Sequence, residues 1–188
     1  KLRLIHDALR GRFPFIDRVA VAVHDPARGT LRTYLASIDA GPPLQRYESR
    51  LEDAPSLQDI LRAGRPRVVN DLKIFEGGGH EHTRAISERG YLASYTMPIR
   101  VNGVFWGFVF FNSRQPGCFT AEVLDALDVH AHLVAAVASA ESMAVRALAG
   151  AVKTAHATVH LRDPETGRHL DRMAEFSRII ARDLAAAG

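Results

Sequence analysis

The chain has 188 residues, 47% of them hydrophobic, and a formal net charge of only +3. This length and apolar content predict one domain with a sizeable core and an additional element. Lys and Arg are scattered along the sequence, which argues against a nucleic-acid-binding surface. The sequence contains no run of about 18 apolar residues, so we predict no membrane segment. The single cysteine, Cys118, excludes an internal disulfide and suits a reducing compartment, so we expect a cytoplasmic protein.

A helical pattern is already present at the first residue. Leu2, Ile5 and Leu9 fall on one helical face, and Gly11 and Pro14 predict the end of this helix. Because the chain begins at Lys1 within this pattern, without a Met or a signal-like segment, we expect it to be an excerpt from a longer protein.

The next segment predicts two antiparallel strands. Residues 18–24 alternate Val and Ala, residues 25–29 (Asp-Pro-Ala-Arg-Gly) have turn composition, and residues 30–38 form the returning strand. The mostly polar residues 39–53 predict at most a short edge strand.

A short helix and a short strand follow. We expect Ser56 to cap a helix that runs to Ala63, where Gly64 and Pro66 stop it. Residues 67–70 then predict a short strand. Residues 71–90 predict a loop with three consecutive glycines and a helix at about 81–88.

The most informative segment is a hairpin at residues 93–113. Two apolar runs flank Asn102-Gly103, a pair that fits the positive φ angles of a type I′ turn. The second run has apolar side chains on both faces, as a central strand covered on both sides requires. Pro98 lacks an N–H donor, so we expect its position to face away from a neighbouring strand or to lie at a bulge.

The run P-I-R-V-N-G-V-F-W-G-F-V-F-F-N resembles the signature hairpin of GAF domains, the small sensory modules of bacterial signalling proteins. The order of predicted elements by itself indicates an α+β fold, an antiparallel sheet flanked by helices. That order is also similar to the GAF order, so residues 1–141 are expected to form a GAF-like sensory domain. A long C-terminal signalling helix and one further helix would follow it.

The resemblance also suggests where a ligand would bind. In GAF domains ligands typically lie between the sheet and the segment before the central hairpin, here residues 71–95. The side chains there that offer stacking, hydrogen bonding or positive charge are Phe75, His80, His82, Arg84, Tyr91 and Tyr95.

The ligand itself is left open. His80 and His82 could form a metal pair, but exposed loop histidines are the favoured interpretation. Residues 70–75 share letters with the motif of cyclic-nucleotide-binding GAF domains but lack its order. Cys118 is not at the position where bilin-binding GAF domains carry their cysteine. The effector stays unknown, and a GAF domain that serves only as a dimerising spacer is an alternative.

Residues 120–161 predict one long helix. Thr120 can cap it, and neither Gly nor Pro interrupts residues 121–149. The segment is rich in Ala and in larger apolar residues, which a solitary helix would leave exposed to water. We therefore expect a homodimer through residues 120–161, with residues 142–162 as the linker or signalling helix.

A last helix is predicted from Pro164 to about Ala186, with Asp163 as its N-cap. Glu165 and His169 lie four residues apart on one face, a spacing that lets both side chains reach one metal. The same spacing is common in solvated helix faces and salt bridges.

The run R-D-P-E-T-G-R-H-L-D-R, followed by F-S-R-I-I-A, closely resembles the first helix of HD-GYP domains, phosphodiesterases that linearise cyclic di-GMP. The resemblance implies that Glu165 and His169 bind divalent metal ions in the intact protein. Residues 163–188 would be the truncated start of that domain. This chain is therefore expected to lack catalytic residues and a bound metal.

A second interpretation of the C-terminal segment stays open. His160-Leu161-Arg162-Asp163-Pro164 is similar to the phosphoacceptor sequence His-Glu-Leu-Arg-x-Pro of histidine kinases, although one residue is missing. The sequence thus predicts a GAF sensor that controls an HD-GYP-type phosphodiesterase. The alternatives are the GAF fragment of a histidine kinase and a dimerising spacer without a ligand.

Overall fold

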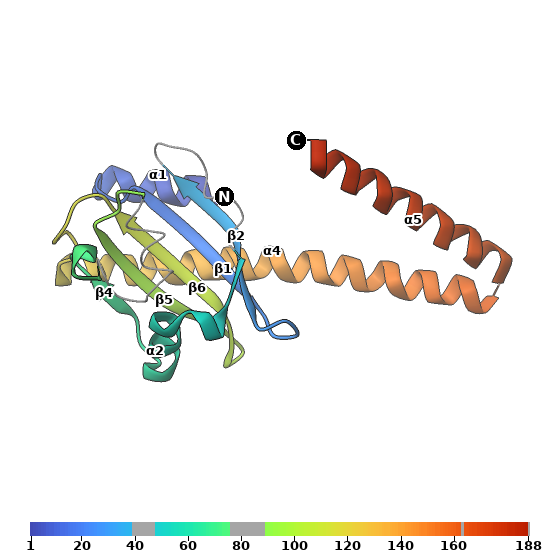
Figure 1. Ribbon diagram of the computed structural model, residues 1–188, viewed down its shortest axis with the longest axis horizontal. Coiled ribbons are helices and arrows are strands. Elements are labelled where there is room, and N and C mark those ends of the chain that lie inside the picture. Colours follow the sequence, from blue (N-terminus) through green and yellow to red (C-terminus); the bar gives the residue numbers. More distant parts are fainter. Residues whose placement is uncertain (39–47, 76–88, 163, 188) are drawn as a thin grey trace. The chain divides into compact units, whose positions relative to one another are not determined.

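The computed structural model describes residues 1–38, 48–75, 89–162 and 164–187 (Figure 1). The chain divides into two compact units, Lys1–Ser139 and Ala140–Gly188. The first unit contains the sheet. The described residues of the second unit are all helical.

The sheet has six strands in the order β3-β2-β1-β6-β5-β4, and all neighbouring strands are antiparallel. The strands are β1 (Arg18–Asp25), β2 (Thr30–Ile38), β3 (Glu48–Arg50), β4 (Arg67–Val69), β5 (Ala93–Val101) and β6 (Val104–Ser113). The predicted α+β fold with an antiparallel sheet is thereby confirmed.

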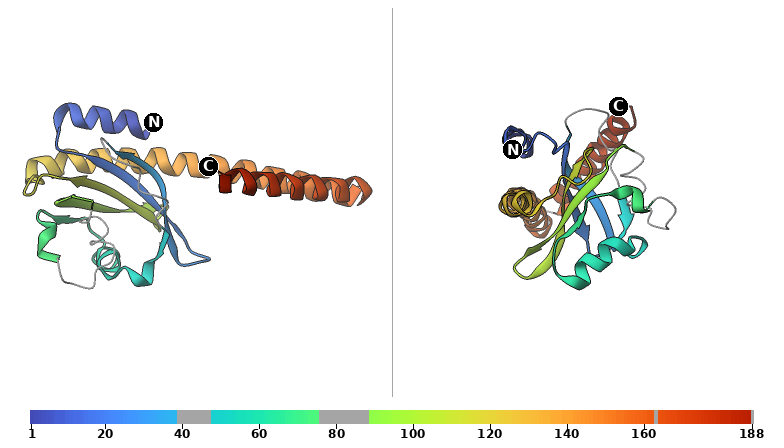
Figure 2. Two further views of the ribbon diagram at one scale, coloured as in Figure 1. Left: turned by 45° about the horizontal axis from the view of Figure 1, so that its top comes forward. Right: turned by 90° about the vertical axis from the view of Figure 1, so that its left-hand side faces the viewer.

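Helices cover both faces of the sheet (Figures 1 and 2). In the first unit α1 and the first part of α4 lie on one face, and α2 lies on the other. The α-helices are α1 (Leu2–Arg12), α2 (Pro55–Ala63), α4 (Ala121–Arg162) and α5 (Pro164–Ala187), and the short 3-10 helices are Leu51–Asp53 and Leu72–Phe75.

The central hairpin has the predicted geometry. Asn102 and Gly103 both have positive φ, 52° and 80°, as a type I′ turn requires. Strand β6 lies between β1 and β5 and is buried over most of its length. Pro98 lies opposite Phe108 of β6, one residue before a register shift between Ile99 and Arg100, and it lies beyond Thr96, the last residue of β5 that pairs with β4.

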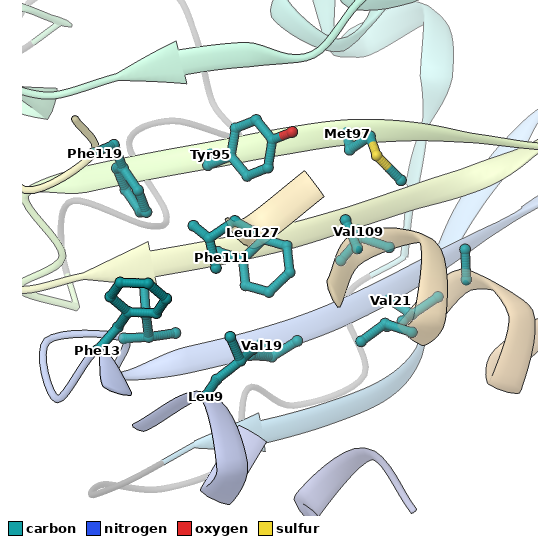
Figure 3. Packing of buried hydrophobic residues seen from close by; sticks show 14 of the residues in the cluster. Leu9, Phe13, Val19, Val21, Tyr95, Met97, Val109, Phe111, Phe119 and Leu127 are labelled. Atoms are coloured by element: carbon teal, nitrogen blue, oxygen red, sulfur yellow. The ribbon is translucent and has the colours of Figure 1, made fainter. Parts of the chain in front are cut away.

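Alternation along the strands produces two cores. One side chain in two from β1, β5 and β6 faces α1 and α4, and Figure 3 shows Val19, Tyr95 and Phe111 on this side with Leu127 of α4. The other side chains of the same strands face α2. This second core consists of Ala20, Ala22, Leu31, Ala54, Leu57, Ile60, Phe108 and Phe110.

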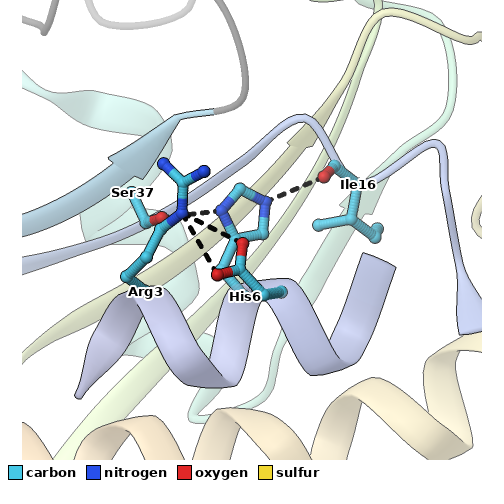
Figure 4. Close-up of polar contacts among 5 residues, drawn as sticks. Arg3, His6, Ile16 and Ser37 are labelled. Atoms are coloured by element: carbon cyan, nitrogen blue, oxygen red, sulfur yellow. Dashed lines mark hydrogen bonds and ion pairs between the residues drawn. The ribbon is translucent and has the colours of Figure 1, made fainter. Parts of the chain in front are cut away.

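One buried polar group lies in the first core. His6 of α1 is buried, and its ring nitrogens lie 2.8 Å from Ser37 Oγ and 2.9 Å from the Ile16 carbonyl oxygen (Figure 4). On the exposed side of the same helix Arg3 pairs with Asp7 at 3.0 Å. These contacts join α1 to β2 and to the turn before β1.

Two helix starts differ in how well the sequence predicted them. Helix α2 begins at Pro55, with Ala54 as the N-cap, so the predicted cap at Ser56 was wrong. Proline favours the first helical position because its φ is already helical, and Ser56 is buried inside the helix. At α4 the prediction was right, since Thr120 Oγ1 accepts a bond from the Val123 N–H at 3.5 Å. The predicted helix at 81–88 and the predicted cap Asp163 lie outside the described residues.

Among the described residues, α4 is the one helix long and apolar enough to cross a membrane. This criterion considers only the length and the composition of a helix. Leu127, Ala131 and Val134 of the same helix are buried against the sheet, as in the core helix of a globular domain. The expectation of a chain without a membrane segment stays a prediction.

Candidate ligand site on the α2 face of the sheet

A row of three polar side chains crosses strands β1, β6 and β5 near one end of these strands. Arg18 of β1 lies opposite Asn112 of β6, which in turn lies opposite Ser94 of β5. The next pairs on the same face of these strands join Ala20, Phe110 and Thr96, and the first two of these residues pack towards α2. The polar row therefore lies on the α2 face, beside an apolar core.

Hydrogen bonds connect the row. Arg18 Nη1 donates to Asn112 Oδ1 at 2.6 Å, and Asn112 Nδ2 donates to Ser94 Oγ at 3.1 Å. Asn112 is fully buried, and only 5% of Arg18 is exposed. The asparagine thus holds one end of the guanidinium in place.

The guanidinium is incompletely satisfied. Within the described part of the chain, Arg18 Nε is buried without a hydrogen-bond partner, and no carboxylate forms an ion pair with this side chain. Burial lowers the pKa of Arg18 to about 10, the neighbouring Tyr91 hydroxyl partly offsets this, and Arg89 lowers it further. Arg18 is still positively charged at neutral pH. A buried charge without a counter-charge is unfavourable by several kcal/mol, so this position is suited to an anion.

Apolar side chains continue the row towards the edge of the sheet. Ser94 pairs with Val69 of β4, and Val69 packs against buried Leu72 and Tyr91. Burial raises the pKa of the Tyr91 hydroxyl, and Arg114 lies over its ring at 5.2 Å from the centroid. Of the two predicted pocket residues whose side chains are described, Tyr91 and Tyr95, Tyr91 is the one beside Arg18.

The other predicted pocket residues lie elsewhere or are not described. Tyr95 faces α4: its ring stacks on Phe111 at 5.9 Å, and its hydroxyl donates to Asp128 at 3.4 Å. Burial, reinforced by Asp128, raises its pKa to about 12. The structure therefore does not bring Tyr95 and Tyr91 together. His80, His82 and Arg84, and the side chain of Phe75, lie outside the described residues.

Sequence reasoning missed the residues that define this site, namely Arg18, Asn112 and Ser94. One signal was available. Arg18 is the first residue of the run 18–23, which is otherwise apolar. A charged side chain is ordinarily exposed to solvent, so an arginine in a strand predicted to be buried is unusual.

The only cysteine does not have the properties of a reactive group. Cys118 is buried, and burial raises the pKa of its thiol, although a hydrogen bond with Ser113 acts in the opposite direction. Reactive cysteines have a lowered pKa and partial exposure. Thiol chemistry at this position is therefore disfavoured.

The described residues do not test the predicted metal pair Glu165 and His169. His169 is exposed on α5, and the side chain of Glu165 lies outside the described residues. A metal cluster of the HD-GYP type needs several protein ligands for each ion, and one described histidine does not supply them. No catalytic step can be derived from this pair.

Comparison with known proteins identifies the family. Residues 3–138 match the GAF domain family, and the chain belongs to it. A search of curated proteins found no significant match.

Solved structures share the fold at low identity. A GAF domain/HD domain protein from Geobacter sulfurreducens is 16% identical, with a TM-score of 0.59 over 76% of this chain and 92% of that one. The GAF domain of a two-component sensor histidine kinase from Bacillus halodurans is 12% identical, with a TM-score of 0.59 over 76% and 97%. A type II free methionine-R-sulfoxide reductase from Thermoplasma acidophilum is 18% identical, with a TM-score of 0.55 over 73% and 89%. At these identities the likeness is one of fold.

Proposed function

We propose that this chain is the sensor module of a bacterial signalling protein and that it binds a small organic anion on the α2 face of the sheet. The observation that carries the proposal is Arg18, a buried guanidinium whose Nε has no partner among the described residues. A carboxylate or phosphate oxygen on the ligand would accept a hydrogen bond from Nε and supply the missing negative charge.

The surroundings of Arg18 support an organic ligand rather than a bare inorganic ion. Asn112 fixes the orientation of the guanidinium, and Ser94 adds a hydroxyl in the same row. Val69, Leu72 and Tyr91 continue the row with apolar surface. Ligand sites of this kind combine a few fixed polar groups with an apolar wall.

We further propose that α4 transmits binding to an HD-GYP-type phosphodiesterase in the intact protein, with Glu165 and His169 among its metal ligands. The run Pro-Glu-Thr-Gly-Arg-His at residues 164–169 supports this output, and the Geobacter protein combines GAF and HD domains. A GAF domain of a histidine kinase is equally similar in fold, so a kinase output is the second candidate. GAF modules of either kind are typical of cytoplasmic signalling proteins.

Ligand binding is tested by thermal denaturation of the purified chain with a panel of carboxylates, sugar phosphates and nucleotides, each paired with a neutral analogue. We expect stabilisation by one anionic class and none by its neutral analogue, with the dissociation constant measured by calorimetry. Arg18→Gln should abolish the effect. Arg32→Gln, which removes an exposed cation paired with Glu48 at 3.4 Å, should not. A dimerising spacer would respond to no member of the panel.

The output is tested on the full-length protein. We expect His-Asp and Gly-Tyr-Pro motifs after residue 188 and hydrolysis of cyclic di-GMP that Glu165→Ala and His169→Ala both abolish. An ATP-binding domain in that place, with phosphate transfer to His160, would establish the kinase alternative.

A further inference from the structure

Three side chains that the sequence analysis did not connect meet within the second unit. His156 and His160 lie one turn apart on α4, and Asp171 of α5 faces both. His156 Nε2 lies 3.0 Å from Asp171 Oδ1, and His160 Nε2 lies 2.9 Å from Asp171 Oδ2. The two imidazole rings are 4.7 Å apart between centroids.

The nitrogen–oxygen separations are close to those in the coordination sphere of a transition-metal ion. One ligand atom from each residue can be chosen so that all three lie within 4.8 Å of one another. Zinc bonds of about 2.0 to 2.1 Å place two ligand atoms of a tetrahedron about 3.3 Å apart, close to the observed nitrogen–oxygen distances. Small rotations of the side chains would bring the set to coordinating geometry.

The chemistry of the three ligands selects the class of ion. Two imidazole nitrogens at positions i and i+4 of one helix are a frequent metal-binding pair, and a carboxylate completes a set of two histidines and one acid. Imidazole favours zinc and its transition-metal neighbours over calcium and magnesium, which prefer oxygen ligands. Three protein ligands leave a coordination position for water.

The backbone of α5 makes room for one of the ligands. A Cβ atom built on Gly167 would lie 2.4 Å from Nδ1 of His160, so any larger residue there would displace the imidazole. The glycine thus allows His160 to lie against the first turn of α5 and to reach Asp171.

Hydrogen bonding alone is a weak reason for this arrangement. Each imidazole N–H can donate to one carboxylate oxygen, but the side chains are 36%, 33% and 55% exposed. Interactions between exposed ionisable groups typically contribute about 0 to 1 kcal/mol. The same exposure gives an ion direct access from solvent.

We propose that His156, His160 and Asp171 together bind one divalent transition-metal ion, zinc by preference, which links α4 to α5. The site is independent of the proposed anion site on the sheet. It departs from the expectation that this chain binds no metal, and it differs from Glu165 and His169, the ligands that the HD-GYP resemblance implies. Bound metal would hold the two helices together at the point where the proposed output domain begins.

The test is metal titration of residues 1–188, without an affinity tag and freed of metal by a chelator. We expect one zinc ion per chain by calorimetry and a cobalt spectrum with the strong visible absorption of a four- or five-coordinate ion. His156→Ala, His160→Ala and Asp171→Asn should each weaken binding by about 100-fold or more, since even loss of a group that only orients a ligand costs about 10 to 100-fold. Gly167→Ala removes no ligand but should weaken binding by about 10-fold through the displaced His160.

Matched controls separate this site from other histidines. His132→Ala removes a histidine that also lies one turn from an aspartate, Asp128, at 3.7 Å, and it should bind zinc like the parent. The double variant His80→Ala/His82→Ala should also bind like the parent. Circular dichroism checks that each variant keeps its helices. The cobalt spectrum is measured on the parent chain, so this test does not depend on the folding of any variant.

Three results would overturn the proposal. The first is no stoichiometric binding by the parent chain. The second is unchanged affinity in the His156, His160 and Asp171 variants. The third is binding that is lost only when His80 and His82 are replaced.

Discussion

A single buried histidine makes the stability of the sheet domain depend on pH. A carbonyl oxygen only accepts hydrogen bonds, so His6 Nε2 must donate to the Ile16 carbonyl, and Nδ1 of the neutral ring accepts from the Ser37 hydroxyl. Burial lowers the pKa of His6, the bond to Ile16 partly offsets this, and Arg10 lowers the pKa further. The folded state therefore favours the neutral ring.

The first prediction concerns pH. Because the pKa of His6 is lower in the folded than in the unfolded state, the unfolded chain binds more protons once the pH falls below about 6.5, and the free energy of unfolding decreases. Urea denaturation at about pH 7.5 and about pH 5.5 should show this loss, and His6→Gln should reduce it. His132→Gln, an exposed control, should keep it. An identical pH dependence in His6→Gln and the parent would contradict the prediction.

The second prediction concerns Arg18 in the absence of ligand. Replacing a buried charge by an apolar side chain of similar length removes the desolvation penalty, so Arg18→Met should stabilise the ligand-free chain by about 1 kcal/mol or more. The same variant should lose anion binding. Equilibrium denaturation measures the change, with Arg32→Met as the control. A variant less stable than the parent would contradict the prediction, and would mean either that Arg18 is already neutralised in the free protein or that loss of its bond to Asn112 outweighs the desolvation penalty.

At the scale of elements, the central strand β6 is buried over most of its length. Phe108 is fully buried against the α2 side, and Phe105 and Phe110 lie at 5.1 and 5.9 Å from its ring. Next to it, a Cβ atom on Gly107 would lie 2.1 Å from the Ala22 carbonyl oxygen, so β1 and β6 approach too closely for any other residue. Strand β6 is therefore constrained by both its side chains and its backbone.

The third prediction follows from this packing. Phe108→Ala and Phe110→Ala should each lower the free energy of unfolding by about 3 to 5 kcal/mol, because each leaves a cavity in a core with few alternative contacts. Chemical denaturation measures the loss. Val104→Ala, at the exposed start of the same strand, should change stability little. Parent-like stability of the phenylalanine variants would mean that the strand is placed wrongly.

The elements were more predictable from the sequence than the sites. Local signals determine the hairpin: Asn102-Gly103 fits one turn type, and continuous apolar residues indicate a central strand. The start of α2 was missed by two residues, because Pro55 and Ser56 both favour helix starts and the observed N-cap is Ala54. Arg18 and Asn112 are 94 positions apart, and only the register of β1 with β6 brings them together. His156 and Asp171 likewise meet only once the path of the chain between α4 and α5 is known.

For the whole molecule, the central question is what covers the apolar surface of α4. In addition to the residues packed on the sheet, α4 has several large apolar side chains that are exposed: Val129, Leu133, Met143, Val145, Leu148 and Val152. Apolar surface of this extent favours association. A second copy of the same helix is a simple partner because a two-fold axis covers both surfaces at once.

The fourth prediction is a homodimer through α4. Light scattering at micromolar concentration should give twice the chain mass of 20.6 kDa. Leu148→Glu should convert the dimer to a monomer without changing the sheet, because Leu148 is 67% exposed and far along α4 from the sheet-packed residues. A parent chain that is monomeric at this concentration would contradict the prediction.

Pro98 has a consequence for how copies of this domain can associate. Strand β4 ends its pairing at Thr96, so no strand of the described residues pairs with the outer side of β5 beyond that point. An open strand edge is a template on which a foreign strand can add, and such addition leads to aggregation. Proline offers no N–H to an incoming strand, so it protects this edge from strand addition. Copies of the domain are therefore discouraged from joining sheet to sheet along this part of β5.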